Sequence, residues 1–270
     1  YIDAPGVGDF RAMPARGSGC ACLKWVTSYP GNSNRGLPVV RGALLVSALA
    51  TGELVAVIDC AAVTSLRTGA AAAVSARALA RADARSVGIV GCGVNGAWAA
   101  RCLAAAGYGP GVCHDLRPEP AEALAAELGW RAGGREEAVA ADVVVTVTPG
   151  GRPVVLAGEL RPGAHLAVLG ADAAGKAEVE PAELRRCRLF CDEWEQASKG
   201  GELAGPVSRG ELERAAVTDL GAVLDGSAPG RTDDAEITLF DSTGLAIQDL
   251  AVAIAAYERA GELDLQRLDL

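Results

Sequence analysis

The stretch Arg85-Ser-Val-Gly-Ile-Val-Gly-Cys-Gly-Val-Asn-Gly-Ala-Trp-Ala-Ala100 decides the fold that we expect. A short apolar run leads into Gly91-x-Gly93-x-x-Gly96 and then into an alanine-rich segment, which is typical of strand, tight turn and helix. The first glycine permits a sharp turn, the second lets the backbone approach a pyrophosphate, and the third lets helix and strand pack closely. Because the helix N-terminus faces the phosphate charge, this stretch predicts a dinucleotide-binding turn.

A second strand-like segment, Gly111–Asp115, ends in a carboxylate at roughly the spacing of about 20 residues that such sites show. Asp115 can accept hydrogen bonds from the adenosine ribose, and its charge should repel a 2′-phosphate. We therefore expect NAD to be preferred over NADP. Arg117, two residues later, is the feature that opposes this expectation.

Composition favours a soluble globular protein of one large or two modest domains, because 50% of the 270 residues are hydrophobic. The net charge of -9 includes no basic cluster, which argues against a nucleic acid or an anionic membrane surface as partner. The sequence shows neither an apolar run of about 18 residues nor the features of a signal peptide. We expect a cytoplasmic protein, with some N-terminal sequence missing before Tyr1 because the chain does not start with Met.

The eight cysteines form no CxxC pair, and the chain has two histidines. This pattern predicts reduced, mostly buried thiols and no metal site.

The first 80 residues should form a separate region. It begins with Gly- and Pro-rich loops, and it continues with strand-like runs over 37–46 and 54–59 that fit an antiparallel hairpin. The alanine-rich segment 65–82 predicts a connecting helix.

Beyond Asp115 we expect further alternating elements. Helices are predicted over 120–128, 212–224 and from about 245 to 259, and strands over 142–148, 165–170, 188–192 and 236–240. Strands that alternate with helices predict an α/β fold, here a Rossmann-type doubly wound parallel sheet. We place it at 81–242, and we place a discontinuous α+β substrate-binding and dimerisation domain at 1–80 plus 243–270.

Several motifs outside the glycine turn resemble those of one family. They are Arg11-Ala-Met-Pro-Ala15, Lys24, Asn34-Arg-Gly-Leu-Pro38, Leu66-Arg-Thr-Gly-Ala70, Gly170-Ala-Asp172, Gly175-Lys176 and Phe240-Asp-Ser-Thr-Gly-Leu-Ala-Ile-Gln-Asp249. Together they resemble the ornithine cyclodeaminase and mu-crystallin family, and within it most closely the archaeal-type alanine dehydrogenases. The resemblance runs nearly end to end.

The resemblance implies a role for four residues. Arg11 matches the arginine that holds the substrate carboxylate, and Lys24 matches the lysine that acts as acid or base at the substrate amine. Arg67 matches a residue beside the nicotinamide and the substrate, and Asp172 matches the catalytic aspartate. Physically, a guanidinium can bind a carboxylate through two parallel hydrogen bonds. A lysine near two arginines should lose its proton more easily than a free one.

Cofactor contacts are expected at the glycine turn and at the ends of later strands. Besides Arg67 and Asp115, the expected residues are Thr68, Gly91, Gly93, Val94, Asn95, Gly96, Thr146, Thr148, Gly170, Lys176 and Ser242.

The function implied is NAD-dependent oxidation of a small L-amino acid at its Cα amine through an imine, with alanine dehydrogenation expected first. Ornithine cyclodeamination with recycled NAD, reduction of a cyclic imine such as pyrroline-2-carboxylate, and a mu-crystallin-like dinucleotide-dependent binding protein stay open as alternatives. Ala173-Ala174 replaces the Ala-Pro or Cys-Pro of the two enzyme groups, and Val39 replaces a threonine that meets the cofactor in many members. The family's habit and the alternating apolar positions over 37–46 and 54–58 suggest a homodimer.

Overall fold

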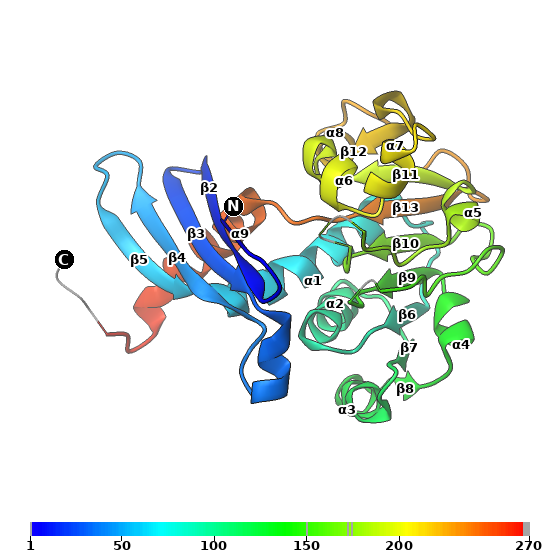
Figure 1. Ribbon diagram of the computed structural model, residues 1–270, viewed down its shortest axis with the longest axis horizontal. Coiled ribbons are helices and arrows are strands. Elements are labelled where there is room, and N and C mark those ends of the chain that lie inside the picture. Colours follow the sequence, from blue (N-terminus) through cyan, green and yellow to red (C-terminus); the bar gives the residue numbers. More distant parts are fainter. Residues whose placement is uncertain (1, 150, 172, 174, 267–270) are drawn as a thin grey trace. The chain divides into compact units, whose positions relative to one another are not determined.

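The computed structural model describes residues 2–149, 151–171, 173 and 175–266 (Figure 1). Contacts within the chain divide it into two compact units. Unit 1 comprises Tyr1–Arg67 and Leu245–Leu270, and unit 2 comprises Thr68–Gly244. The division therefore falls inside the long helix α1 (Cys60–Leu79) and just before helix α9 (Ala246–Glu258).

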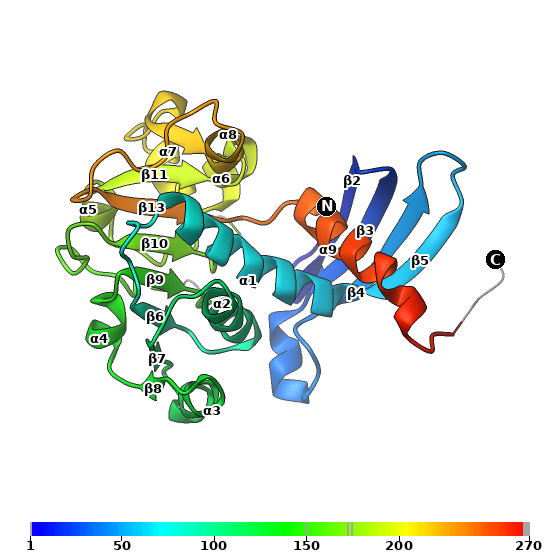
Figure 2. The same cartoon turned by 180° about the vertical axis from the view of Figure 1, so that it is seen from behind.

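Unit 1 contains an antiparallel five-stranded sheet in sequential order, with a helix across one face (Figure 2). Its elements are β1 (Ile2–Ala4), β2 (Gly8–Gly17), β3 (Cys20–Ser28), η1 (Pro30–Arg35), β4 (Val40–Ala48), β5 (Leu54–Asp59), the first part of α1, α9 and η3 (Ala260–Glu262). α9 contacts β2, β3 and β4. The residues buried beneath it include Leu44, Val46, Leu250 and Ala253.

The expectation of loops before the first strand-like run is wrong, because β2 and β3 form a continuous antiparallel ladder from Asp9 to Ser28. The proline that suggested a loop, Pro14, lies where β2 is an edge strand, since β1 pairs only with Gly8–Phe10. An edge strand tolerates a proline because no neighbour needs its missing N–H. The predicted hairpin is present as β4 and β5, which start and end close to the expected positions.

Unit 2 contains an eight-stranded sheet whose paired strands are all parallel, in the order β12-β11-β13-β10-β9-β6-β7-β8. The strands are β6 (Val87–Val90), β7 (Gly111–His114), β8 (Arg131–Ala132), β9 (Val143–Thr146), β10 (His165–Val168), β11 (Cys187–Cys191), β12 (Val217–Asp219) and β13 (Ile237–Asp241). The predicted doubly wound parallel sheet is confirmed. Because β7 and β9 lie on opposite sides of β6, the strand order reverses there, which is where such sheets bind ligands.

Helices of unit 2 cover the sheet on both faces (Figures 1 and 2). They are α2 (Val94–Ala105), α3 (Pro118–Leu128), α4 (Arg135–Val139), α5 (Pro181–Leu184), α6 (Trp194–Gly200), α7 (Ala204–Ser208), η2 (Arg214–Ala216) and α8 (Leu220–Leu224). The strand residues of β6, β9 and β10 are buried throughout. Their nearly continuous apolar runs are what a parallel sheet with two covered faces requires.

The predicted helix over 212–224 is only partly right. Its middle, Val217–Asp219, is strand β12, which pairs with β11, and α8 follows it. Among the described residues, no helix has both the length and the apolar character needed to cross a lipid bilayer.

Candidate active site

The glycine turn of unit 2 links β6 to α2 and presents an open backbone surface. Gly91 has a φ of +99°, a conformation that side chains disfavour. A Cβ on Gly96 would collide with the carbonyl oxygen of Gly91, whereas a Cβ on Gly93 would have no heavy atom within 4 Å. Gly93 is also the N-cap of α2, and no side chain caps the first amides of that helix. The turn therefore fits a pyrophosphate, which would take the place of the missing cap.

Asp115 follows β7 and is joined to this turn by hydrogen bonds. Its carboxylate accepts the N–H of Cys92 at 2.8 Å and that of Arg117 at 3.0 Å. The backbone thus fixes the acceptor at the carboxyl end of the strand next to β6. This is the position from which a carboxylate reaches the adenosine ribose of a bound dinucleotide.

The expected contacts at the ends of β9 and β10 are tied to a buried carboxylate that the sequence did not single out, Glu178. It accepts the Oγ1 hydrogens of Thr146 (3.0 Å) and Thr148 (2.7 Å) and the N–H of Gly170 (2.8 Å). Burial raises the pKa of Glu178. These bonds hold the two strand ends together, and the contacts of Thr146, Thr148 and Gly170 with a cofactor remain a prediction.

Unit 1 brings Lys24 and Arg67 together around a third residue, Asp249. The Nζ atom of Lys24, in β3, lies 2.9 Å from Oδ1 of Asp249, in α9. The Nε atom of Arg67, in α1, lies 3.4 Å from the same oxygen. Lys24 is 1% exposed and Asp249 is fully buried.

The environment of Lys24 lowers the pKa of its amine. Burial is the largest cause and the charge of Arg67 the second, while Asp249 acts in the opposite direction. A lysine whose pKa falls toward the working pH can both accept and donate a proton, as acid–base catalysis requires. Lys24 is thus a buried lysine and not a solvated one on the surface of a strand.

Arg11 lies on the same face of the sheet as Lys24. It pairs in register with Val26, and Lys24 pairs with Met13, so the two polar side chains project from adjacent positions of β2 and β3. The Arg11 guanidinium donates to both carboxylate oxygens of Asp9, at 2.8 and 3.0 Å. Asp9 therefore fixes the plane of this guanidinium.

The remaining predicted residues have varied settings. Val94 is exposed and Asn95 half-buried at the start of α2, Lys176 is half-buried in the loop after β10, and Thr68 is buried in α1. Ser242 follows β13 and donates to Asp192 at 3.3 Å. Asp172 lies outside the described residues.

Asp249 is the functional candidate that sequence reasoning missed, although it ends one of the motifs that suggested the family. The sequence does contain a signal for it. Asp249 is a lone acid that stands directly before the apolar run Leu250-Ala-Val-Ala-Ile254. An acid on the buried face of a helix needs a cationic partner.

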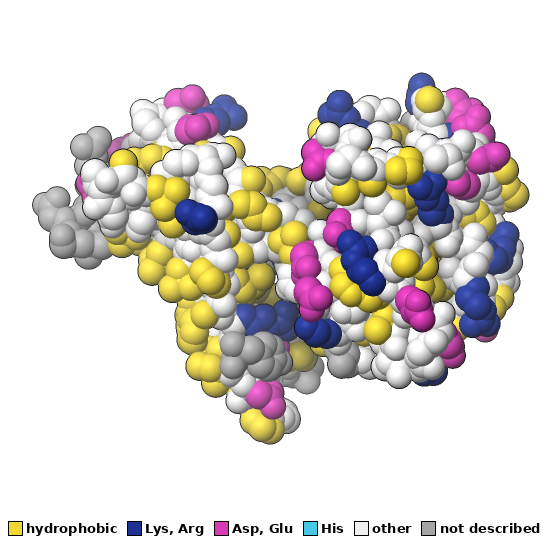
Figure 3. Space-filling model, turned by 90° about the horizontal axis from the view of Figure 1, so that it is seen from above, with side chains coloured by type: hydrophobic (Ala, Val, Ile, Leu, Met, Phe, Trp, Pro, Cys, Tyr) yellow, Lys and Arg dark blue, Asp and Glu magenta, His cyan; other side chains and the backbone are white. Residues whose placement is uncertain are grey.

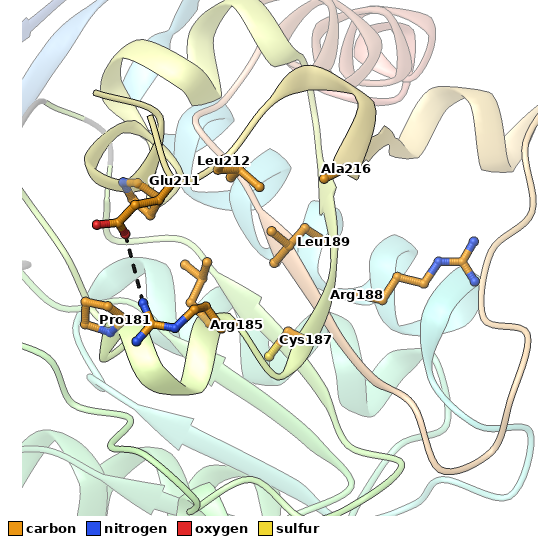
Figure 4. Close-up of a pocket in the computed structure, with 10 residues that line it drawn as sticks. Pro181, Arg185, Cys187, Arg188, Leu189, Glu211, Leu212 and Ala216 are labelled. Carbon is orange, nitrogen blue, oxygen red and sulfur yellow. Dashed lines mark ion pairs between the residues drawn. The ribbon is translucent and has the colours of Figure 1, made fainter. Parts of the chain in front are cut away.

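A pocket of about 250 Å³ lies elsewhere in unit 2 (Figure 4). It is lined by α5, β11 and the segment around Leu212, with Arg185 and Glu211 forming an ion pair across it at 4.0 Å. It includes none of the predicted site residues, so we do not assign the activity to it.

Comparison with known proteins decides the family. The model of the ornithine cyclodeaminase/mu-crystallin family matches residues 4–263. The chain belongs to this family. This match confirms the family resemblance that the motifs of this chain suggested.

Three relatives within the ornithine cyclodeaminase/mu-crystallin family are most informative. An alanine dehydrogenase of Archaeoglobus fulgidus is 41% identical over 260 residues, covering 94% of this chain and 81% of the relative. The solved structure of an archaeal alanine dehydrogenase dimer with bound NAD is 40% identical, with a TM-score of 0.92 over 97% of this chain and 84% of that one. The iminosuccinate reductase of Paracoccus denitrificans in complex with NAD+ is 32% identical, with a TM-score of 0.85 over 94% and 81%.

Proposed function

We propose that this protein is an NAD-dependent oxidoreductase that acts on the Cα amine of a small L-amino acid through an imine. The reaction is the reversible conversion of L-alanine, NAD+ and water to pyruvate, ammonium, NADH and a proton. The observation that supports it best is the buried Lys24 amine between Asp249 and Arg67. The identity to an alanine dehydrogenase over most of both chains supports the choice of alanine.

Unit 2 supplies the cofactor side of this reaction. The backbone at Gly93 and the first turn of α2 would hold the pyrophosphate, and Asp115 would hold the adenosine ribose. When bound, the dinucleotide supplies the acceptor for the Cα hydride. Both solved relatives contain NAD, which agrees with the preference expected from Asp115.

Unit 1 supplies the substrate side. Arg11, its plane fixed by Asp9, binds the substrate carboxylate and so orients the Cα hydrogen. Lys24 takes a proton from the substrate ammonium, which leaves the lone pair that expels the hydride. Lys24 then assists water in its attack on the imine, and Arg67 keeps the site positive beside the substrate. Asp172 remains a proposed catalytic residue on the resemblance alone.

The protein is also proposed to be a cytoplasmic homodimer. Unit 1 exposes apolar side chains on the sheet face opposite α9 (Figure 3). Leu23, Trp25, Leu45 and Val57 alternate with the buried positions of their strands, and each is 37–53% exposed. An exposed apolar face of this kind marks an interaction surface, and an archaeal relative is a dimer.

A substrate panel tests the proposal. Alanine, ornithine, lysine, pyrroline-2-carboxylate and iminosuccinate are offered with NAD(H) or NADP(H), and both the cofactor absorbance and ammonia are followed. We expect net NADH formation from alanine. Ammonia release from ornithine without net NADH identifies a cyclodeaminase, and oxidation of NADH by an imine alone identifies a reductase, a possibility that the iminosuccinate reductase relative favours. Equal or better use of NADPH contradicts the assignment to Asp115.

A further inference from the structure

We propose that Asp249 is the positioning residue of this site, and that it holds the Lys24 amine in place and stabilises the positive charge that the amine gains when it takes the proton of the substrate. The inference rests on the proposed function insofar as Lys24 is the proton-transfer group. The contacts that support it are independent of the substrate.

The first argument is the geometry of a single oxygen. Oδ1 of Asp249 meets Lys24 Nζ at 2.9 Å with hydrogen-bond geometry, and Arg67 Nε at 3.4 Å without it. Lys24 has a long side chain, and holding it in one conformation costs rotamer entropy. A direct bond from a helix to a strand residue 225 positions away holds that amine in one place.

The second argument is the incomplete bonding of Asp249. Its Oδ2 atom is buried and has no hydrogen-bond partner among the residues that the structure describes. A buried carboxylate that serves stability is normally fully bonded, and an apolar side chain would fill the same space at lower cost. Asp192, in unit 2, shows the contrast, because its carboxylate accepts bonds from Thr243, Gly244 and Glu193. The Oδ2 atom of Asp249 therefore has the capacity to accept a further hydrogen bond beside Lys24.

The third argument is the balance of charges around the amine. The groups that act on Lys24 are Arg67 of α1, Asp249 of α9 and the thiol of Cys60, the first residue of α1. The thiol of Cys22, two residues away in β3, lies on the same face of the sheet, and burial raises its pKa. Burial and Arg67 both favour the neutral amine, whereas Asp249, through its charge and its hydrogen bond, favours the protonated amine more than the Cys60 thiol does. Removing its charge should let the amine lose its proton at lower pH.

The chain allows a direct test, because its lysines are Lys24, Lys176 and Lys199 only. Incorporation of lysine labelled with ¹³C at Cε gives three NMR signals, which single Lys→Arg variants assign. The titration midpoint of each amine is then measured in the full chain without substrate or cofactor. We expect the Lys24 midpoint to lie below that of Lys199, and to fall by a further ~1–3 pH units in Asp249→Asn.

Glu195→Gln is the matched control. Lys199 and Glu195 are also 2.9 Å apart, but their side chains are 73% and 70% exposed. This variant should shift only the Lys199 midpoint, and by less, because water screens the pair. The Lys176 signal and the circular dichroism spectrum report whether each variant folds. Asp249→Ser, which removes the charge with a smaller side chain, serves if Asp249→Asn does not fold.

A Lys24 midpoint that stays unchanged or rises in the Asp249 variants would overturn the proposal. Kinetics provide the second readout. With alanine and NAD, the acidic limb of the pH profile of kcat should move to lower pH in Asp249→Asn, and kcat at the optimum should fall ~10–100-fold because the amine is less well placed. Asp249→Glu keeps the charge, so the acidic limb of its pH profile of kcat should lie at the same pH as in the wild type. If alanine proves not to be a substrate, the proposed function fails while the NMR result still decides the role of Asp249.

Discussion

The amine of Lys24 and the carboxylate of Asp249 form an ion pair of 2.9 Å in which both side chains are at least 98% buried. One partner lies in a strand near the start of the chain and the other in the helix near its end. The pair thus joins the two ends of unit 1 around Lys24, the residue that we propose as the proton-transfer group.

Replacement of Lys24 by Met should abolish turnover while leaving cofactor binding intact. The apolar side chain has a similar length but cannot exchange protons, so kcat should fall by ~10²–10⁴-fold. NADH binding, followed by nicotinamide fluorescence, should change less than about twofold because all the predicted cofactor residues except Arg67 lie in unit 2. Lys199→Met is the control at an exposed lysine. Unchanged turnover with bound NADH would favour a binding protein over an enzyme.

Two alanine substitutions in the glycine turn should have opposite effects. Gly93→Ala adds a methyl group to open space, so the chain should fold and lose at least ~10-fold in NAD affinity, because we propose that the pyrophosphate binds in that space. Gly96→Ala forces a methyl group against the Gly91 carbonyl and should prevent stable folding. Thermal unfolding and cofactor titration distinguish the two. NAD affinity that survives in Gly93→Ala would place the cofactor elsewhere.

Stability should fall as the pH rises from 5 to 8, and Glu202 should contribute to this fall. Burial raises its pKa to about 7 in the folded chain, with Glu178 and Asp241 nearby. The pKa of Glu202 is near ~4.3 in the unfolded chain and about 7 in the folded chain, so the native state binds more protons between these two values. The contribution of Glu202 to the free energy of unfolding is therefore complete at low pH and is lost as the pH rises through about 7.

The Glu202→Gln variant isolates this effect. The difference in free energy of unfolding between pH 5 and pH 8, measured by urea denaturation, should shrink by ~2–3 kcal/mol. The variant also loses hydrogen bonds to the backbone N–H groups of Glu178 and Val179. This loss lowers the free energy of unfolding at both pH 5 and pH 8, so it cancels in the difference. The exposed Glu213→Gln serves as control, and an unchanged difference in Glu202→Gln would argue against a protonated Glu202.

A charge introduced on the exposed apolar face of the unit 1 sheet should cause the proposed dimer to dissociate into monomers. Trp25→Glu places a carboxylate at the centre of this face, where a dimer would bury it without a partner. Sedimentation analysis should show a dimer for the wild type and a monomer for the variant. Leu116→Glu, at an 84% exposed position of unit 2, should remain a dimer. If the wild-type protein sediments as a monomer, the proposed dimer is wrong.

The sequence predicted unit 2 better than unit 1, for a physical reason. Strands such as β6 and β9 are buried on both faces and read as continuous apolar runs between turn residues, so their order along the chain is visible locally. β2 contains Pro14 and begins and ends with glycine, and β3 contains Lys24. Their pairing depends on contacts that only the folded sheet provides. The same reason hid β12, whose three residues become a strand by pairing with β11.

The site followed the same pattern. Lys24, Arg67 and the glycine turn were predicted because their motifs are local. Asp249 and Glu178 were missed as functional groups because each acts on partners far away in the sequence, at separations of 225 and about 30 residues respectively. Burial of a charged residue shows only in the folded chain.

The most direct test of the central claim is to follow the Cα hydrogen itself. Alanine deuterated at Cα is incubated with NAD+ and the wild-type protein, and pyruvate, ammonia and the reduced cofactor are quantified together by mass spectrometry. The account predicts one deuterium in each reduced nicotinamide, with pyruvate and ammonia formed in equal amounts. Absence of net reduced cofactor, or ammonia released without pyruvate, would contradict it.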